Sequence, residues 1–169
     1  MAPSMNKKTV LTGKRLLIVD DEKDILDTLV NLLDDCKLDT ASSFEEAKKL
    51  LSTENYDLVV LDIMGVQGYD LLDMAKKRCI PALMLTAHAL SESDLIQSAQ
   101  RGASFYAPKD KIMDIALFVS DVLEATENMK NPWLRWYERL GSYYDRAFRG
   151  QNWRQREKAF WKKKLEGLW

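Results

Sequence analysis

The stretch LLIVDD at residues 16–21 joins a short apolar run to two carboxylates, Asp20 and Asp21. Three further stretches have the same form, an apolar run followed by a polar residue: LVVLD at 58–62, ALMLT at 82–86 and SFYAPK at 104–109. Runs of this length and composition are typical of strands buried on both faces of a parallel sheet. The sequence therefore predicts four strands of one sheet, each with a polar side chain at its carboxyl end.

Helical patterns alternate with these strands. Apolar residues recur at helical spacing over residues 25–33, 47–51, 71–75 and 112–126. Two helix starts are marked by Ser43 with Glu46, a capping box, and by Ser91 with Asp94. A weaker strand candidate covers residues 36–41. Because parallel strands need crossover connections, which are right-handed, helices are expected on both faces of the sheet. The predicted fold class is α/β, with a doubly wound five-stranded parallel sheet.

Residues 131–169 differ in composition from the rest of the chain. They carry 10 Lys/Arg against 4 Asp/Glu, and all five Trp, whereas residues 1–130 carry 15 against 22. Asn131 and Pro132 fit the N-cap and the first position of a helix. Aromatic and aliphatic residues then repeat at helical spacing over 133–148 and again over 153–168. We therefore divide the chain into a domain at 14–129 and an aromatic, basic helical tail at 131–169, in which we recognise no output domain.

Composition also narrows the setting. The two cysteines, Cys36 and Cys79, are isolated in predicted core or near-core positions, and they show neither metal-binding spacing nor a disulfide framework. This favours a reducing, cytoplasmic location. The first 14 residues have no apolar core of signal-peptide length, and no run reaches the roughly 18 apolar residues that a membrane span needs. The single histidine, His88, is expected to be an ordinary surface residue.

The polar residues at the strand ends are predicted to meet, because open α/β sheets bind ligands at the carboxyl ends of their strands. Asp20, Asp21 and Asp62 would then form a cluster of hard oxygen ligands that suits Mg²⁺. An aspartate can act as the nucleophile towards a phosphoryl group. The ammonium of Lys109 and the hydroxyl of Thr86 would contact the phosphoryl oxygens.

Together with LDIM at 61–64, LTA at 85–87 and GASFYAPK at 102–109, these stretches resemble the receiver domain of bacterial two-component response regulators. The resemblance covers roughly residues 14–129, with the motifs in matching order and spacing. It implies a flavodoxin-like sheet of strand order 2-1-3-4-5. It also implies phosphorelay signal transduction, in which the chain becomes a phosphoprotein.

The resemblance assigns the acceptor and the metal ligands. Asp62 is implied to be the phosphoacceptor, with a sensor histidine kinase as the donor. Asp20, Asp21, Asp62 and the backbone carbonyl of Met64 are implied to hold Mg²⁺ or Mn²⁺. The loop after Asp62 is shorter than the family pattern and lacks its proline. Met64 is apolar and cannot orient an attacking water, so we expect slow autodephosphorylation.

Four further positions match the part of the family's site that binds the phosphoryl group and responds to it. The backbone N–H of Ala87 and the side chain of Lys109 are implied to contact the phosphoryl group. Thr86 is the switch hydroxyl, and Tyr106 is the switch aromatic that turns inward when Thr86 is drawn to the phosphoryl group. Asp110 stands where the family usually has proline, so we expect a trans peptide bond after Lys109.

Three functions remain open on the sequence. The first is a phosphorylation-driven switch that contacts an unknown downstream protein, or a second copy as a homodimer, through the helix from Ser91, the strand 104–108 and the helix after it. The second is a transcriptional regulator whose basic tail contacts DNA, although nucleic acid is the less favoured partner. The third, a phosphatase, is disfavoured because Met64 occupies the place of its second aspartate, so we do not expect an enzyme beyond the chain's own phosphotransfer.

The tail itself has several readings. An aromatic stripe at helical spacing is most often a packing surface, either docked on the receiver or at a dimer interface. An anionic membrane surface or another protein is the alternative partner for a basic amphipathic hairpin.

Overall fold

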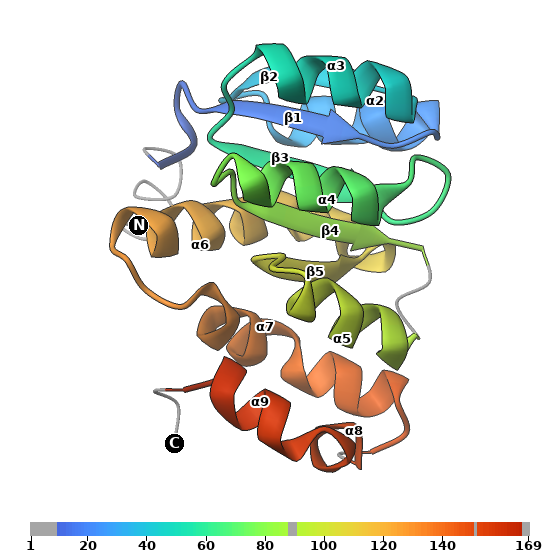
Figure 1. The fold of residues 1–169 in the computed structure, drawn as a ribbon, viewed down its shortest axis with the longest axis vertical. Coiled ribbons are helices and arrows are strands. Elements are labelled where there is room, and N and C mark those ends of the chain that lie inside the picture. The colour runs from blue at the N-terminus through green and yellow to red at the C-terminus, as the bar shows by residue number, and fades with distance from the viewer. Residues whose placement is uncertain (1–9, 88–90, 151, 167–169) are drawn as a thin grey trace.

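The structure is a computed structural model that describes residues 10–87, 91–150 and 152–166 (Figure 1). Within these ranges, parallel strands form one sheet in the order β2-β1-β3-β4-β5, which confirms the expected topology. The strands are β1 (Arg15–Val19), β2 (Lys37–Ala41), β3 (Leu58–Asp62), β4 (Ala82–Thr86) and β5 (Phe105–Pro108).

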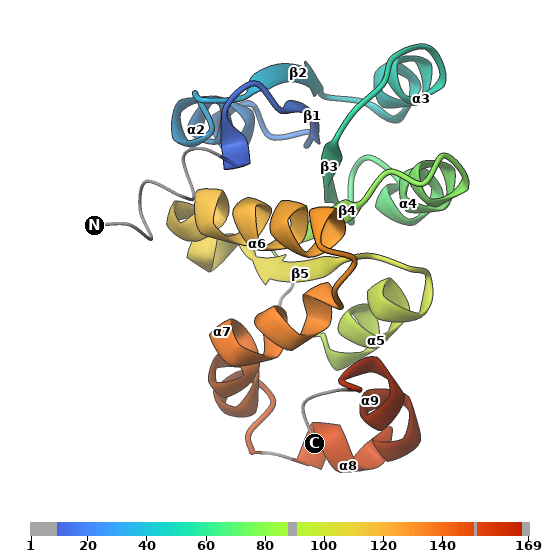
Figure 2. The ribbon, with the colours of Figure 1, turned by 90° about the vertical axis from the view of Figure 1, so that its left-hand side faces the viewer.

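Helices cover both faces of the sheet, as predicted for a doubly wound fold. They are α2 (Lys23–Leu32), α3 (Phe44–Thr53), α4 (Gly68–Lys77), α5 (Glu92–Gln100) and α6 (Ile115–Glu127), with a short 3₁₀ segment η1 (Lys109–Asp114) before α6. Figure 2 shows α2 and α6 on one face and α3, α4 and α5 on the other. Every residue of β3 and β4 is buried, whereas β2, at the edge, is only partly buried. This exposure explains why β2 is the weakest strand signal in the sequence.

The predicted helix starts are confirmed. Ser43 caps α3 and its hydroxyl accepts from the Glu46 N–H (3.2 Å), while Ser91 does the same for α5. Of the two hydrogen bonds that define a capping box, only the one to the Ser43 hydroxyl is formed. The Glu46 carboxylate accepts from the Ser42 N–H (3.0 Å) rather than from the Ser43 N–H. Asn131 caps the first tail helix by accepting from the Trp133 N–H (3.0 Å).

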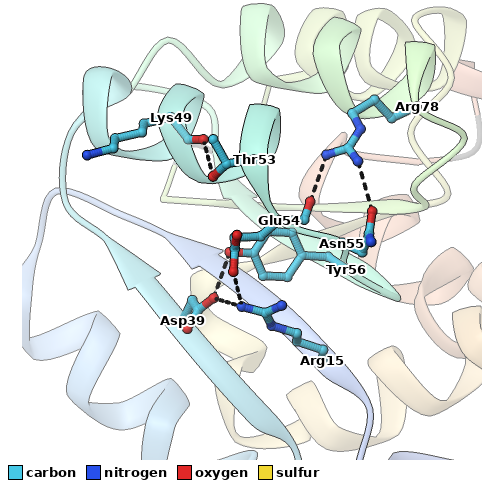
Figure 3. A network of polar contacts seen from close by, with 8 residues as sticks. All are labelled: Arg15, Asp39, Lys49, Thr53, Glu54, Asn55, Tyr56 and Arg78. Atoms are coloured by element: carbon cyan, nitrogen blue, oxygen red, sulfur yellow. Dashed lines mark hydrogen bonds and ion pairs between the residues drawn. The ribbon is translucent and has the colours of Figure 1, made fainter.

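A network of polar contacts closes the end of the sheet opposite the polar strand ends (Figure 3). Arg15, the first residue of β1, donates to Asp39 Oδ2 (3.0 Å) and to Glu54 Oε1 (2.8 Å). Tyr56 donates to the same Asp39 oxygen (2.7 Å), and Arg78 donates to the Glu54 carbonyl (2.7 Å). These contacts connect β1, β2 and the α3–β3 loop. They lie away from the carboxyl ends of the strands, where the predicted site residues are.

The tail forms α7 (Pro132–Ala147), α8 (Asn152–Arg156) and α9 (Lys158–Lys164). The helical spacing over 153–168 predicted one helix, but the structure interrupts it at Glu157, and residues 167–169 lie outside the described part of the chain. In a continuous helix, Trp153 and Trp161 would be about 12 Å apart along the axis. The interruption brings their ring centroids to 5.2 Å and lets both contact Trp136.

The tail is docked on the domain at 14–129, which is the first of the two packing alternatives given for its aromatic stripe. Helix α7 packs against β5 and α6 (Figure 2). The tail's buried large side chains are Trp133, Trp136, Leu140, Tyr144, Trp153, Trp161 and Leu165. On the α6 side Arg139 pairs with the buried Asp121, and on the α5 side Lys164 Nζ donates to the Ala99 carbonyl (3.1 Å).

This packing bears on one expectation about partners. The α5–β5–α6 surface was predicted to contact a downstream protein or a second copy of the chain, with the tail extending or masking it. In the structure α7 and α9 cover it, so a homodimer through this face would require the tail to leave. Among the described residues, no helix combines the length and the hydropathy that crossing a bilayer requires.

We predict that the tail and the domain at 14–129 unfold as one unit. Because every Trp lies in residues 131–169, tryptophan fluorescence reports the tail, while far-UV circular dichroism reports the whole chain. Trp153→Ala removes a side chain with no exposed surface and should lower the free energy of unfolding by about 3–5 kcal/mol in urea. Both probes should give the same midpoint, in the wild type and in the variant.

Ser142→Ala, at an exposed position of α7, is the control, with an expected change within about 0.5 kcal/mol. Separate fluorescence and dichroism transitions would show that the tail unfolds independently.

Candidate functional site

Three carboxylates meet at the carboxyl edge of the sheet, as predicted. Asp20 follows β1 and Asp62 ends β3, and the pairing of Val19 with Leu61 places these two aspartates side by side. With Asp21 they offer three oxygens that all lie within 4.8 Å of one another. Asp20 and Asp62 are buried, whereas Asp21 is exposed.

Lys109 directly follows the carboxyl end of β5, and its side chain extends to this cluster. Its Nζ lies 2.8 Å from Asp20 Oδ2, 3.4 Å from Asp62 Oδ1 and 3.0 Å from Glu22 Oε1. The Lys109 side chain is only 10% exposed. Glu22 was not predicted as a site residue. Its carboxylate holds Lys109, and its backbone N–H donates to Asp20 Oδ1 (2.9 Å). Nothing in its local pattern distinguishes it from a residue that starts α2.

Burial and crowding of charge shift the ionisation of these groups. The pKa of Asp62 is raised to about 6, first by burial and then by the neighbouring charge of Asp20, although Lys109 opposes the shift. Burial also raises the pKa of Asp20 despite its hydrogen bond from Lys109. Burial alone would lower the pKa of Lys109, but its contacts with Asp20, Glu22 and Asp62 together raise it.

The donor set fits a divalent cation. Lys109 supplies one ammonium, which contacts Asp20, Asp62 and Glu22. With Asp21, the third member of the cluster, four carboxylates surround this one cation. The raised pKa of Asp62 reflects part of this uncompensated negative charge. Hard carboxylate oxygens with no nitrogen or sulfur ligand among them suit Mg²⁺ or Mn²⁺ rather than Zn²⁺.

Two glycines allow this close packing: Gly65, in the short loop between β3 and α4, and Gly68, the first residue of α4. Gly65 has a φ of +79°, and a Cβ there would lie 2.4 Å from Asp21 Oδ2. A Cβ on Gly68 would lie 2.0 Å from the carbonyl oxygen of Asp62. The role of both glycines depends on a close approach in space that no local pattern reveals.

The remaining predicted residues divide into two groups. A pocket of about 330 Å³ opens over the cluster and is lined by Asp21, Glu22, Asp62, Met64, Gly65, Ala87 and Lys109. Thr86 is buried at the end of β4, where it pairs with Pro108. Tyr106 does not line the pocket: its ring is buried, and its hydroxyl donates to the Ser91 carbonyl (3.4 Å). The structure thus brings Asp62, Ala87 and Lys109 to one pocket. Tyr106 lies outside the lining of this pocket and contacts the N-cap of α5.

Smaller expectations can also be compared with the structure. The peptide bond after Lys109 is trans, as expected with Asp110 next to it. Cys36 is partly buried, but Cys79 is exposed rather than near the core. His88 lies outside the described residues.

Comparison with known proteins gives a consistent family. The family model of the response regulator receiver domain matches residues 16–129, which leaves the tail outside the match. The response regulator SaeR of Staphylococcus epidermidis is 40% identical over 100 residues, covering 56% of this chain and 43% of SaeR. The alkaline phosphatase synthesis transcriptional regulatory protein PhoP of Bacillus subtilis is 39% identical over 103 residues, covering 57% and 42%. The matched segment thus spans less than half the length of these relatives.

Solved structures agree with the fold. A CheY-like response regulator receiver domain protein from Methanospirillum hungatei has a TM-score of 0.64 at 26% identity, covering 70% of this chain and 99% of that one. The receiver domain of the Francisella response regulator 1452 has a TM-score of 0.61 at 26% identity, covering 68% and 99%.

The electrostatics of the site predict a stabilising substitution. In the folded chain the pKa of Asp62 is about 6, above the unfolded value of about 3.9. The folded state therefore loses stability as the pH rises from about 4 through 6. Without divalent cations at pH 7.5, Asp62→Asn should raise the free energy of unfolding by about 1–3 kcal/mol. The gain should vanish near pH 4, and Mg²⁺ should stabilise the wild type more than the variant.

Asp27→Asn, at an exposed carboxylate of α2, is the control and should change little at either pH. The measurement is thermal or urea unfolding across pH 4–8. A variant less stable than the wild type at pH 7.5 would contradict the proposed crowding of charge around Asp62.

Proposed function

Since the chain belongs to the receiver-domain family of response regulators, we propose that it accepts a phosphoryl group on Asp62 from a sensor histidine kinase. The observation that carries this proposal is the position of Asp62. It is a buried carboxylate at a strand end, beside two other aspartates and a lysine, and it lines an open pocket. A carboxylate in that place can be reached by a phosphoryl donor and has charged partners for the product.

In the proposed reaction a carboxylate oxygen of Asp62 attacks phosphorus. A P–O bond forms, the P–N bond of the donor phosphohistidine breaks, and the departing imidazole nitrogen takes a proton from solvent. Lys109 would exchange its 3.4 Å contact with the Asp62 carboxylate for a contact with a phosphoryl oxygen. Thr86 and the backbone N–H of Ala87 would bind the other oxygens. Thr86 is the last residue of β4, Ala87 follows it, and Lys109 follows the last residue of β5. These groups therefore lie at the same edge of the sheet as Asp62, so little rearrangement is needed.

Asp20, Asp21 and Asp62, with the backbone carbonyl of Met64, would hold Mg²⁺ or Mn²⁺. The cation would offset the negative charge that the phosphoryl group brings to the carboxylates. Burial of Asp20 and its bond from the Glu22 N–H (2.9 Å) hold that carboxylate in place. Gly65 lets the loop pass close to Asp21.

We propose that the chain is a switch rather than an enzyme acting on external substrates. Met64, two residues after Asp62, lines the pocket and is 59% exposed. Its thioether side chain can neither donate a proton to a leaving group nor orient an attacking water. A phosphorylated Asp62 would therefore persist, which suits a chain that signals by its modified state.

The alternative, a tail that contacts DNA, has less support. PhoP is a transcriptional regulatory protein, but it is more than twice as long as the segment it shares with this chain. Trp133, Trp136, Trp153 and Trp161 are all buried and cannot stack on bases. The readout we favour is contact with an unknown downstream protein.

The free thiols of Cys36 and Cys79 support a cytoplasmic location.

The test uses the full chain with Mg²⁺ and a small radiolabelled phosphodonor such as acetyl phosphate. We expect about one acid-stable, hydroxylamine-labile label per chain, as an acyl phosphate requires, and none in Asp62→Asn. Asp57→Asn, at a carboxylate on the opposite edge of the sheet, is the matched control and should be labelled normally. Labelling of Asp62→Asn would refute the assignment of the acceptor, and steady release of phosphate by the wild type would favour the enzyme.

A further inference from the structure

Strand β5 connects the proposed phosphoryl site to the tail. Lys109, which holds Asp20 and Asp62, directly follows the last residue of β5. Three residues earlier, the carbonyl of Tyr106 accepts a hydrogen bond from the Trp136 indole N–H of α7 (2.8 Å). A shift of Lys109 therefore acts on a short strand that the tail holds at Tyr106.

The tail also encloses the Tyr106 side chain. The ring of Tyr144 lies 5.8 Å from that of Tyr106, and the Tyr144 hydroxyl is 3.5 Å from the same Tyr106 carbonyl. On the other side, the Tyr106 hydroxyl donates to the carbonyl of Ser91, the N-cap of α5. Tyr106 therefore has no exposed surface, and its position depends on α7 as well as on α5.

We propose that the tail is a permanent layer of this receiver that positions β5 and Lys109, so that tail docking and occupancy of Asp62 favour each other. This inference rests on the proposed function of Asp62. It assigns Trp136 and Tyr144 as positioning residues that act on the phosphoryl site through β5.

The sign of the coupling follows from pre-organisation. A strand already fixed by the tail loses less conformational freedom when Lys109 engages a phosphoryl group, so the two events help each other. Thermodynamic linkage makes the effect reciprocal. The factor by which the docked tail raises the affinity of the site for a phosphoryl group is also the factor by which the bound group favours docking of the tail. The typical size of such coupling is about 5–150-fold in affinity.

The contacts of the tail argue against its release on phosphorylation. Undocking would return several buried indoles to water, and it would leave the buried Asp121 without its partner Arg139. It would also break the contacts of Arg156 with Glu92 and of Lys164 with the Ala99 carbonyl. A tail that leaves the α5–β5–α6 face to expose it is the opposite model, and the experiment distinguishes the two.

Two tryptophans of α7 make a matched pair for the test. The Trp136 N–H donates to the Tyr106 carbonyl (2.8 Å) and the Trp133 N–H to the Ala103 carbonyl (2.9 Å), and both rings are buried. Replacing either by Phe removes one indole–carbonyl bond and keeps an aromatic ring. Only the bond of Trp136 is made to β5 itself.

The measurement is the affinity of the full chain for beryllofluoride, an analogue of the phosphoryl group, at fixed Mg²⁺. We expect Trp136→Phe to weaken binding by at least about 5-fold, and Trp133→Phe to change it by less than 2-fold. A loss of stability alone would lower the melting temperature of free and loaded protein equally. Coupling instead reduces the rise in melting temperature on loading, and it does so only in Trp136→Phe.

Tyr144→Phe, which keeps the ring and removes the hydroxyl, is the second variant if Trp136→Phe does not fold, and it should also weaken binding. Equal affinities in the wild type and in the folded variants would refute the coupling while leaving Asp62 as the acceptor. Tighter binding in Trp136→Phe would show that the tail opposes loading, as a releasable cover would. If the wild type binds no beryllofluoride and takes no phosphoryl label, the proposed function fails and this inference with it.

Discussion

In the part of the chain that the structure describes, strand β5 lies at the edge of the sheet, with β4 as its single strand neighbour. The free edge of such a strand exposes unpaired backbone groups and needs a cover. Here the cover is the tail, which supplies indole N–H groups to the carbonyls of Ala103 and Tyr106 and packs aromatic rings behind them. Receiver and tail consequently share one hydrophobic core. The same short strand is followed directly by Lys109, the cation of the carboxylate cluster. Whatever holds β5 therefore also holds the chemical site.

The energies favour a tail that stays in place. Burying an aromatic side chain contributes roughly 3 kcal/mol, and the described residues of the tail include four buried indoles and the buried Tyr144. Coupling between two sites in a protein is typically about 1–3 kcal/mol, enough to tighten or loosen such a layer but not to remove it. A signal from Asp62 would then pass through the tail to its outer side. Because α7 and α9 cover the α5–β5–α6 face, the tail changes which surface a partner can contact.

The sequence predicted the parts of the site that each lie at a strand end. Asp20, Asp62 and Lys109 were found because an apolar run followed by a polar residue is a local pattern, and parallel strands bring such ends together. Contacts that depend on three-dimensional approach were not predictable in this way. Glu22 bonds to Lys109 across 87 positions of sequence, and Gly65 matters only because its loop passes Asp21. The aromatic periodicity of the tail predicted a packing surface but could not say that β5 was its partner, nor that the helix would break at Glu157.

The most direct measurement is the solvent exchange of the Trp136 indole proton, observed by NMR in the ¹⁵N-tryptophan-labelled full chain. The chain contains five tryptophans, so the indole region is simple, and Trp136→Phe identifies the signal. If the docked tail and the loaded site favour each other, saturating Mg²⁺ and beryllofluoride will slow this exchange. Faster exchange on loading would mean that the tail leaves β5 when Asp62 is occupied. An unchanged rate, in protein shown to bind beryllofluoride, would mean that the tail and the phosphoryl site are independent.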